Sequence, residues 1–286
     1  MKILILGGTG MLGHQLINAC IERGLNWFAL ARQTQKLLDF LGEKYHDKLI
    51  TFSDVNNFNE LEEIINSVKP DYIINCIGII KQSHLANNYL EALSVNALLP
   101  HKLEKLASVT NAKLIHISTD CVFNGKVGNY LEKSFSDADD LYGRSKFLGE
   151  VNYGSGITLR TSIIGKELPG NNYGLINWFF NQHNKINGYT RAIFSGLTTV
   201  ELSKVILDIV IPQNLAAGLY QVASKPISKY ELLTKIKKIF NNDVDILPFD
   251  EFEIDRSLDA ENFYKITGYR CPNWDEMIYE MKVKQY

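Results

Sequence analysis

The alternation of short apolar runs with helix-patterned segments restricts the fold of this chain more than any other feature. Apolar, often β-branched runs are separated by segments in which apolar residues recur every three or four positions. Buried strands that alternate with helices indicate a parallel sheet covered by helices on both faces. The expected strands are 2–6, 27–31, 49–52, 72–76, 113–118 and 157–161, and the expected helices are 11–23, 58–68, 89–110 and 141–153.

A glycine-rich turn follows the first expected strand directly. Gly7, Gly10 and Gly13 form a G-x-x-G-x-x-G spacing between that strand and the first expected helix. Glycines allow a tight turn and a close approach of a ligand, and the amides of a helix N-terminus attract the negative charge of a pyrophosphate. In this strand–turn–helix context the spacing predicts a dinucleotide-binding loop, with Thr9 and Met11 as further contacts.

The segment after the second expected strand, FALARQTQK, bears on the choice of dinucleotide. A carboxylate there would bind the ribose hydroxyls of NAD, whereas an arginine suits the 2′-phosphate of NADP. The segment holds Arg32 and no carboxylate. We therefore expect NADP(H) as the preferred cofactor, with NAD(H) also acceptable; the alternative is that Arg32 is a solvated loop residue. Asp54 and Val55 at the end of the third strand are further expected contacts, since the carboxylate could meet the adenine amine; the alternative for Asp54 is a helix cap. Cys76 at the end of the fourth strand and Gly78 beyond it complete the expected cofactor contacts.

The texture of the sequence changes near residue 165. Asn, Gly and Tyr become frequent, and 165–188 has weak periodicity. Beyond it we expect a helix at 199–211, a strand at 218–222, a helix from Ser228 to about 240, and a tail of short elements punctuated by Pro248 and Pro272. The prediction is an α/β protein in which 1–164 form a Rossmann-type doubly wound parallel sheet, with 196–224 returning to it. A smaller mixed α/β domain of 165–195 and 225–286 would bind the substrate.

Charge and composition limit the partners. The 286-residue chain has a formal net charge of −2, with 45% hydrophobic and 22% charged residues. Nucleic-acid-binding proteins usually present a basic face, so we expect no nucleic-acid partner. The lack of a long apolar stretch argues against a membrane partner, and no Cys/His spacing indicates a metal site. Four scattered cysteines and no recognisable leader favour a cytoplasmic protein.

Polar residues end the expected strand 113–118. The run HISTDCVFNG places Ser118, Thr119 and Asp120 directly after apolar positions. Such a strand end either meets water or forms one wall of an active site. For Asp120 the alternatives are a contact to a substrate hydroxyl and a local cap or turn carboxylate.

The segment LYGRSKFLGE contains Tyr142 and Lys146, which share one face of a helix. A free phenol has a pKa of about 10, and a nearby ammonium favours the phenolate, which makes tyrosine a usable acid or base near neutral pH. The spacing alone is common on solvated helices. Its place after the glycine loop and the Ser-Thr-Asp strand end favours an active site.

With these motifs in this order, the sequence resembles the extended short-chain dehydrogenases/reductases. Within that superfamily it is most similar to the dTDP-4-dehydrorhamnose reductase branch of nucleotide-sugar reductases. The resemblance covers nearly the whole chain. It rests on the glycine loop, Asn75 in NCIG, Ser118-Thr119-Asp120, Tyr142-x-x-x-Lys146, LRTSIIG at 159–165 and GLYQVAS at 218–224.

The resemblance implies an NADP(H)-dependent reduction of the 4-keto group of a nucleotide-activated 4-keto-6-deoxy sugar, for polysaccharide biosynthesis. It implies that Thr119 hydrogen-bonds the reacting oxygen and that Tyr142 donates the proton. Lys146 would bind the nicotinamide ribose and lower the pKa of the tyrosine. Cys121 departs from the pattern, since related dehydratases carry a glutamate there and rhamnose reductases usually a tyrosine. A thiol cannot replace that glutamate, so dehydration is not expected, and the identity of the sugar stays open.

The expected substrate contacts are Lys81, Asp120, Cys121, Arg191 and Arg256. Lys81 follows the fourth strand, where the sugar would lie. A guanidinium can grip phosphate bidentately, so the two arginines are candidates for the diphosphate of a nucleotide sugar. The alternative for each arginine is an ordinary surface position.

Other functions stay open at this point. A nucleotide-sugar 4-epimerase with tightly held NAD would favour an acidic residue after the second strand, which is absent. A non-catalytic NADP-binding regulatory subunit would favour loss of Tyr142 or Lys146, and both are present. A nucleic-acid or membrane-binding module would need a basic stripe or an amphipathic anchor, and the sequence shows neither. By analogy within the superfamily, helices 89–110 and 141–153 could pair across a two-fold axis in a homodimer.

Overall fold

The computed structural model describes residues 1–83, 85, 87–170 and 173–285. By its internal contacts the chain divides into two compact units. Unit 1 consists of Met1–Ser118, Asp139–Leu159 and Asn214–Leu219, and unit 2 consists of Thr119–Ala138, Arg160–Gln213 and Tyr220–Tyr286. The expected assignment of one domain to the dinucleotide and the other to the substrate stays a prediction.

The main sheet has seven strands in the order β10-β6-β5-β4-β1-β2-β3. Every pair from β3 through β5 is parallel, and the chain order reverses between β1 and β4. This doubly wound arrangement confirms the expected Rossmann-type α/β fold. Ligands of such sheets bind beyond the carboxyl ends of the strands at the point of reversal. The strands are β1 (Lys2–Leu6), β2 (Asn26–Ala31), β3 (Leu49–Thr51), β4 (Tyr72–Asn75), β5 (Lys113–Thr119), β6 (Gly156–Thr161) and β10 (Gly218–Gln221).

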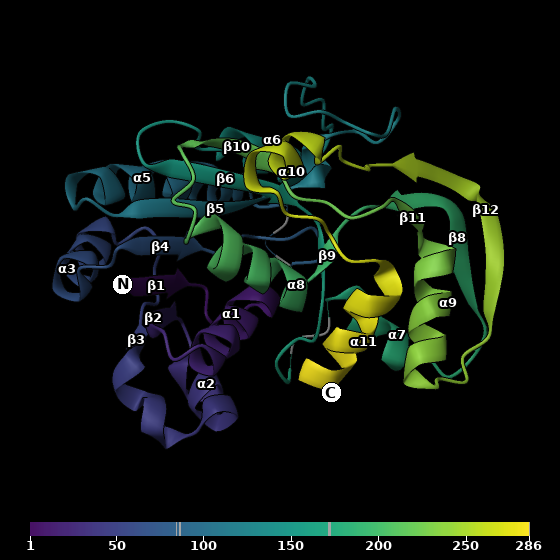
Figure 1. Ribbon diagram of the computed structural model, residues 1–286, viewed down its shortest axis with the longest axis horizontal. Helices are drawn as coiled ribbons and strands as arrows, with labels where there is room; N and C mark the ends of the chain where they lie inside the picture. Colours follow the sequence, from purple (N-terminus) through teal and green to yellow (C-terminus); the bar gives the residue numbers. More distant parts are fainter. Residues whose placement is uncertain (84, 86, 171–172, 286) are drawn as a thin grey trace. The chain divides into compact units, whose positions relative to one another are not determined.

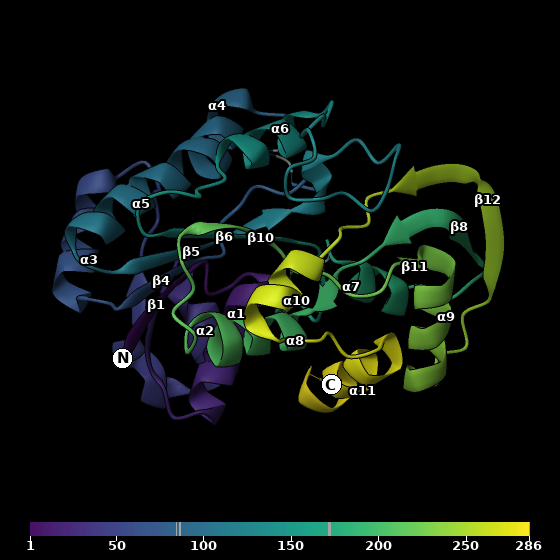
Figure 2. The same cartoon turned by 45° about the horizontal axis from the view of Figure 1, so that its top comes forward.

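Helices of unit 1 lie on both faces of this sheet. Apolar residues of α3 and α5 join those of β1, β2, β4 and β5 in one hydrophobic cluster. Figures 1 and 2 show α1 and α2 on the opposite face. The alternation of side chains along a strand explains the two layers, because Leu4 and Leu6 face the α3–α5 cluster while Ile3 and Ile5 are buried on the other side. The helices are α1 (Met11–Glu22), α2 (Thr34–Leu41), the 3-10 helix η1 (Glu43–Lys48), α3 (Phe58–Val68), α4 (Tyr89–Ala92), the π-helix η2 (Leu93–Leu98), α5 (Leu99–Val109) and α6 (Leu141–Leu148).

Unit 2 contains a three-stranded mixed sheet in the order β11-β8-β12. The central strand β8 is antiparallel to β11 and parallel to β12. Helix α9 packs on β8, and α11 packs on α9. The strands are β7 (Ile163–Ile164), β8 (Ile186–Phe194), β9 (Leu197–Thr198), β11 (Ile227–Ser228) and β12 (Ile246–Asp255). The helices are the 3-10 helix η3 (Asp120–Val122), α7 (Leu175–Phe180), α8 (Thr199–Lys204), the π-helix η4 (Val205–Val210), α9 (Lys229–Phe240), α10 (Glu261–Thr267) and α11 (Trp274–Gln285).

The structure corrects three helix predictions. The helix expected at 199–211 continues from α8 into the π-helix η4. The helix expected at 141–153 ends at Leu148. At Gly149 the backbone lies so close to the carbonyl group of Asn96 that a Cβ atom could not be placed there. The segment expected as one α-helix at 89–110 contains the π-helical stretch η2. Pro100 has no amide hydrogen to donate to the carbonyl oxygen of Asn96. In the wider π turn before it, the Leu99 amide donates to the carbonyl oxygen of Ser94, five residues earlier.

The tail was predicted as short elements, and this is wrong for β12 and for α11, a helix of twelve residues. Strand β12 has ten residues and runs through Pro248, which pairs with Gly188 of β8. Because β12 is an edge strand, a proline without an amide donor is tolerated there. The sequence reading also missed α2 and β8. In the described part of the chain, no helix combines the length and the apolar character needed to cross a membrane.

Candidate active site

Helix α6 holds the Tyr142-x-x-x-Lys146 pair in unit 1. The side chain of Asp140 caps the helix by accepting a hydrogen bond from the Gly143 amide at 2.7 Å. This cap fixes where the first turn begins, so that Tyr142 and Lys146 lie one turn apart on one face. Tyr142 is partly exposed, whereas Lys146 is buried with 5% of its surface accessible. The helix therefore presents a phenol to solvent above a buried ammonium.

The ammonium of Lys146 is held by β5 and desolvated. Its Nζ donates a hydrogen bond to the carbonyl oxygen of Ile117 at 2.7 Å and lies 3.5 Å from Nε2 of His116. Burial lowers the pKa of Lys146 to about 8, and the negative charge of Glu150 opposes this shift. Burial, with the charge of Lys146 as a second cause, lowers the pKa of His116 well below its usual value. At neutral pH the lysine therefore carries the positive charge of this group and the histidine is neutral.

Asn96 connects α6 to the segment after β4, and sequence reasoning missed it. Its amide oxygen accepts from the Ile79 amide at 2.8 Å, and its amide nitrogen donates to the Ile79 carbonyl at 3.0 Å and to Oγ of Ser145 at 3.1 Å. Ser145 in turn donates to the carbonyl oxygen of Tyr142 at 3.0 Å. The available signal was an amide within an apolar helical run, SVNALLP, four residues before a proline. π-Helical turns such as the one that carries Asn96 are frequent at functional sites.

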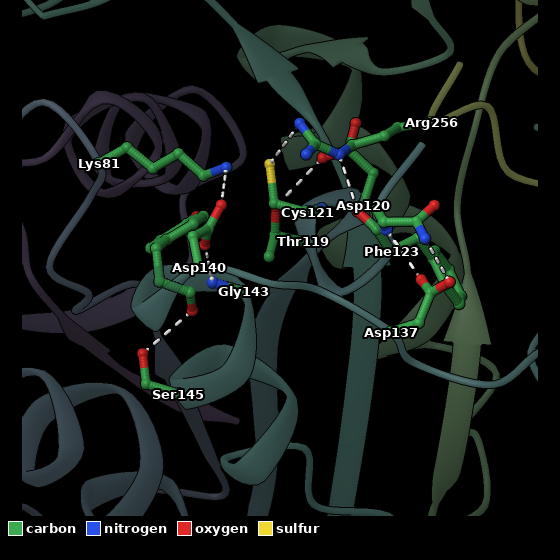
Figure 3. Close-up of polar contacts among 12 residues, drawn as sticks. Lys81, Thr119, Asp120, Cys121, Phe123, Asp137, Asp140, Gly143, Ser145 and Arg256 are labelled. Atoms are coloured by element: carbon green, nitrogen blue, oxygen red, sulfur yellow. Dashed lines mark hydrogen bonds and ion pairs between the residues drawn. The ribbon is translucent and has the colours of Figure 1, made fainter. Parts of the chain in front are cut away.

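Lys81 lies beside Tyr142, but a carboxylate engages it. Its ammonium pairs with the Asp140 carboxylate, as Figure 3 shows, and lies 5.8 Å from the centroid of the Tyr142 ring. Asp140 thus both caps α6 and positions this lysine. The expected substrate contact of Lys81 stays a prediction, while the structure puts the lysine next to the phenol.

The glycine loop has the geometry that a pyrophosphate requires. Gly7 has a φ of +82°, which favours glycine, and its carbonyl oxygen accepts from the Gly10 amide at 2.9 Å. A Cβ atom on Gly13 would collide with that same carbonyl. Gly10 stands at the N-cap of α1 without a side chain to cap it, and the first turn contains no acidic residue. The positive end of α1 is thus open to an anion, so these residues fit a dinucleotide.

The other expected cofactor contacts follow strands of the same sheet. Arg32 comes directly after β2 and is exposed. Asp54 lies three residues beyond the end of β3, and its carboxylate accepts from the Asn56 amide at 2.8 Å. Burial raises the pKa of the Cys76 thiol to about 12, so the thiol is uncharged at neutral pH. The backbone of Gly78 lies close to Lys146: a Cβ atom there would be 3.9 Å from Nζ.

In unit 2, the strand end that carries Thr119 forms a local network. Oγ1 of Thr119 accepts from the Cys121 amide at 3.1 Å and donates to Oδ1 of Asp120 at 3.2 Å. Burial raises the pKa of the Asp120 carboxyl, and the charges of Lys229 and Arg256 oppose that shift. The turn-carboxylate interpretation of Asp120 therefore has a structural basis, while a contact to a sugar hydroxyl stays a prediction.

The two candidate arginines differ in their surroundings. Arg256 donates from Nε to the carbonyl oxygen of Phe123 at 2.8 Å, and its Nη1 lies 3.9 Å from Sγ of Cys121 (Figure 3). The structure thus joins Arg256 to the Thr119 network. Arg191 lies opposite Glu253 in the β8–β12 register and forms an ion pair with it. Within the described residues, the ion pair of Arg191 therefore lies on the β8–β12 strand pair and not in the Thr119 network.

Lys229, which sequence reasoning did not single out, belongs to the same electrostatic group in unit 2. Burial lowers the pKa of Lys229 to about 8, and electrostatic interaction with Asp120, and to a smaller extent with Cys121, opposes this shift. Its Nζ lies 3.8 Å from the centroid of the Phe194 ring. Among the described residues, no group of three or more His, Cys, Asp or Glu side chains could hold a metal ion.

Comparison with known proteins agrees with this architecture. A dTDP-4-dehydrorhamnose reductase of Aggregatibacter actinomycetemcomitans is 27% identical over 248 residues, which are 82% of this chain and 78% of that protein. The crystal structure of a hypothetical dTDP-4-dehydrorhamnose reductase from Sulfolobus tokodaii is 26% identical, with a TM-score of 0.78 over 96% of this chain and 98% of that one. The dTDP-4-dehydrorhamnose reductase of Bacillus anthracis in complex with NADP is 22% identical, with a TM-score of 0.78 over 99% of both chains.

The doubly wound sheet, the glycine loop and the Tyr-x-x-x-Lys helix define an extended short-chain dehydrogenase/reductase, as expected. More particularly, the chain belongs to the family of the RmlD substrate binding domain, whose model matches residues 1–281. Its relatives include dTDP-4-dehydrorhamnose reductases, so the expected class of NAD(P)-dependent oxidoreductase is confirmed at the level of the family.

Proposed function

We propose that this protein uses NADP(H) to reduce the 4-keto group of a nucleotide-activated 4-keto-6-deoxy sugar. The observation that carries the proposal is the anchored Lys146 one helical turn from Tyr142, in a chain whose family and named relatives are dTDP-4-dehydrorhamnose reductase-like. A buried, charged lysine with a fixed carbonyl partner beside a tyrosine suits proton transfer. Burying a charged group costs free energy, so a helix with a purely structural role would be expected to carry a neutral residue here.

In the proposed reaction, a bound nicotinamide supplies hydride to the keto carbon. Tyr142 gives its phenolic proton to the sugar oxygen, and Thr119 hydrogen-bonds that oxygen. Lys146 holds the nicotinamide ribose and stabilises the phenolate left on Tyr142. The ammonium of Lys81, 5.8 Å from the Tyr142 ring centroid, lies beside this phenolate in an ion pair with Asp140.

NADP(H) is the proposed cofactor. The exposed Arg32 directly after β2 supplies a guanidinium where a 2′-phosphate would lie, and the Bacillus anthracis relative was crystallised with NADP. The pyrophosphate would meet the open N-terminus of α1, and Gly78 would let the nicotinamide ribose approach Lys146. Thr9, Met11, Asp54 and Val55 stay proposed contacts of the same cofactor.

We also infer a homodimer, built through unit 1. Apolar side chains are exposed along the helices that were expected to pair: Leu98 and Val109 on η2 and α5, and Leu148 at the end of α6, with accessible fractions of 54%, 68% and 55%. A second copy of this surface would cover them, as the superfamily analogy suggests. The proposed reaction draws on NADPH and a soluble nucleotide sugar, which fits a cytoplasmic enzyme.

The experiment that tests the function is fluorescence-monitored oxidation of NADPH and of NADH by the purified protein. The substrates are enzymatically prepared dTDP-, UDP-, GDP- and CDP-linked 4-keto-6-deoxy sugars. We expect oxidation with at least one of them, faster with NADPH. Tight NADP(H) binding without oxidation on any substrate would reject the reductase. Co-purified NAD would then indicate the epimerase, and its absence the regulatory subunit.

A further inference from the structure

Lys229 occupies a position that the backbone fixes firmly. It is the first residue of α9 and follows β11, whose Ile227 and Ser228 pair with Phe194 and Ile193 of β8. Ser228 and Glu231 form a complete capping box at this helix start. A lysine in the first turn opposes the helix macrodipole, which disfavours positive charge at that end. A residue that breaks such a local rule within an otherwise regular helix start is a candidate for function.

The ammonium of Lys229 packs against an aromatic ring, a contact that uses none of its N–H donors. Its Nζ lies 3.8 Å from the Phe194 ring centroid, and Phe194 is itself buried against Trp274. Within the described residues, the side chain of Lys229 makes no hydrogen bond and no ion pair closer than 4 Å. Lys229 as a whole residue is partly exposed, although its ammonium packs against the Phe194 ring. A cation–π contact holds one side of an ammonium and satisfies none of its N–H donors.

The charged groups that face Lys229 are those of the Thr119 network. The carboxyl of Asp120 and the thiol of Cys121 act on it, and Arg256 lies 3.9 Å from Cys121. The arginines are otherwise engaged, Arg256 with the Phe123 carbonyl and Arg191 with Glu253. Of Lys229, Arg256 and Arg191, only the Lys229 side chain makes no hydrogen bond or ion pair within the described residues, so its N–H donors can bind a ligand.

We propose that Lys229 is a substrate-binding residue that sets specificity, and that its ammonium binds an oxyanion of the nucleotide sugar next to Asp120 and Cys121. This inference rests on the proposed function for the identity of the ligand as a nucleotide sugar. The oxyanion is either the diphosphate or a carboxylate on the sugar, because both present acceptor oxygens with negative charge to an ammonium. Burial lowers the pKa of Lys229 to about 8, so it is cationic at neutral pH and loses its charge above that value.

The test measures ligand affinity by titration calorimetry on the full chain with NADPH present. The probes are dTDP, UDP, GDP and CDP for the diphosphate, and UDP-glucuronate against UDP-glucose for the carboxylate. The variants are Lys229→Met, which keeps the length of the stem, and Lys229→Arg, which keeps the charge. Lys225→Met is the matched control, because Lys225 is an exposed lysine four residues earlier.

If the diphosphate is the ligand group, Lys229→Met weakens binding of the preferred nucleoside diphosphate about tenfold to a hundredfold. If a sugar carboxylate is the group, the nucleoside diphosphates bind both proteins equally, and Lys229→Met removes a preference for UDP-glucuronate over UDP-glucose. In either case Lys229→Arg retains most of the affinity and Lys225→Met retains all of it. Affinity of the wild type falls as the pH rises through about 8, and that of Lys229→Arg does not.

The inference is overturned if Lys229→Met binds every probe as the wild type does, or if no probe binds the wild type. A structural role alone would lower the thermal midpoint of Lys229→Met without changing probe affinity. Affinity that depends on Lys229, together with no NADPH oxidation on any keto sugar, would keep this inference and reject the proposed reaction.

Discussion

The ammonium of Lys146 donates a hydrogen bond to the carbonyl oxygen of Ile117, 2.7 Å away. This bond ties helix α6, which carries Tyr142 and Lys146, to the carboxyl-terminal part of β5. Lys146 is almost fully buried, and its neighbour His116 is kept neutral by the same burial and by the charge of the lysine. The arrangement concentrates one positive charge beside the proposed proton donor without a second cation on the imidazole.

Replacing Tyr142 with phenylalanine removes the proposed proton donor and leaves the ring. We expect Tyr142→Phe to lose about a hundredfold to ten-thousandfold in turnover, the usual contribution of a general acid, with NADPH affinity unchanged. Turnover is followed by NADPH oxidation and affinity by NADPH fluorescence. Tyr153→Phe is the control, since Tyr153 is an exposed tyrosine of unit 1 that bonds His101. Wild-type turnover in Tyr142→Phe would remove the assigned mechanism.

Lys146 also makes stability depend on pH. The pKa of Lys146 in the folded protein is about 8, below the value of 10.5 for a free lysine. Between these values the unfolded chain binds more protons than the folded one, so the stability of the wild type rises with pH. Lys146→Met lacks this contribution. From pH 7 to about pH 9.5, the wild type should therefore gain roughly 2 kcal/mol relative to Lys146→Met.

Thermal midpoints of both proteins across that pH range check this prediction. The comparison uses the change with pH and not the offset at pH 7, because the variant also leaves the Ile117 carbonyl without its donor. A constant difference between the two proteins from pH 7 to about pH 9.5 would mean that Lys146 titrates normally in the folded state.

The glycines of the glycine loop differ in how much space surrounds a Cβ atom placed on them. A Cβ atom on Gly13 would collide with the Gly7 carbonyl, whereas one on Gly10 would stay 3.2 Å from the same oxygen. Gly13→Ala must move α1 away from the loop, and we expect it to unfold at a temperature several degrees lower and to lose NADPH binding. Gly10→Ala should keep most of the thermal stability. Equal midpoints for the two variants would contradict the close approach of α1 to Gly7.

The fold and the motif-bearing parts of the site were predictable because they depend on local chemistry. The glycine loop follows its strand directly, and Tyr142 and Lys146 are one helical turn apart, so neighbouring residues reveal them. Lys229 meets Phe194, thirty-five residues away, through the β8–β11 pairing. Asn96 reaches Ile79 and Ser145 from a π turn that a regular helical pattern conceals. Such contacts come from strand pairing and helix irregularity, which the spacing of residues in one sequence does not specify.

Arg32 provides the last test, that of cofactor choice. Its guanidinium is exposed directly after β2, in a chain with no carboxylate at that place. If it binds a 2′-phosphate, Arg32→Ala should weaken NADPH about tenfold to a hundredfold and leave NADH affinity unchanged, because NADH has no phosphate there. Titrations of both cofactors measure this. Lys44→Ala, which removes an exposed positive charge elsewhere in unit 1, controls for the loss of charge. An equal loss of affinity for NADPH and for NADH would mean that Arg32 supports the loop conformation and does not bind the 2′-phosphate.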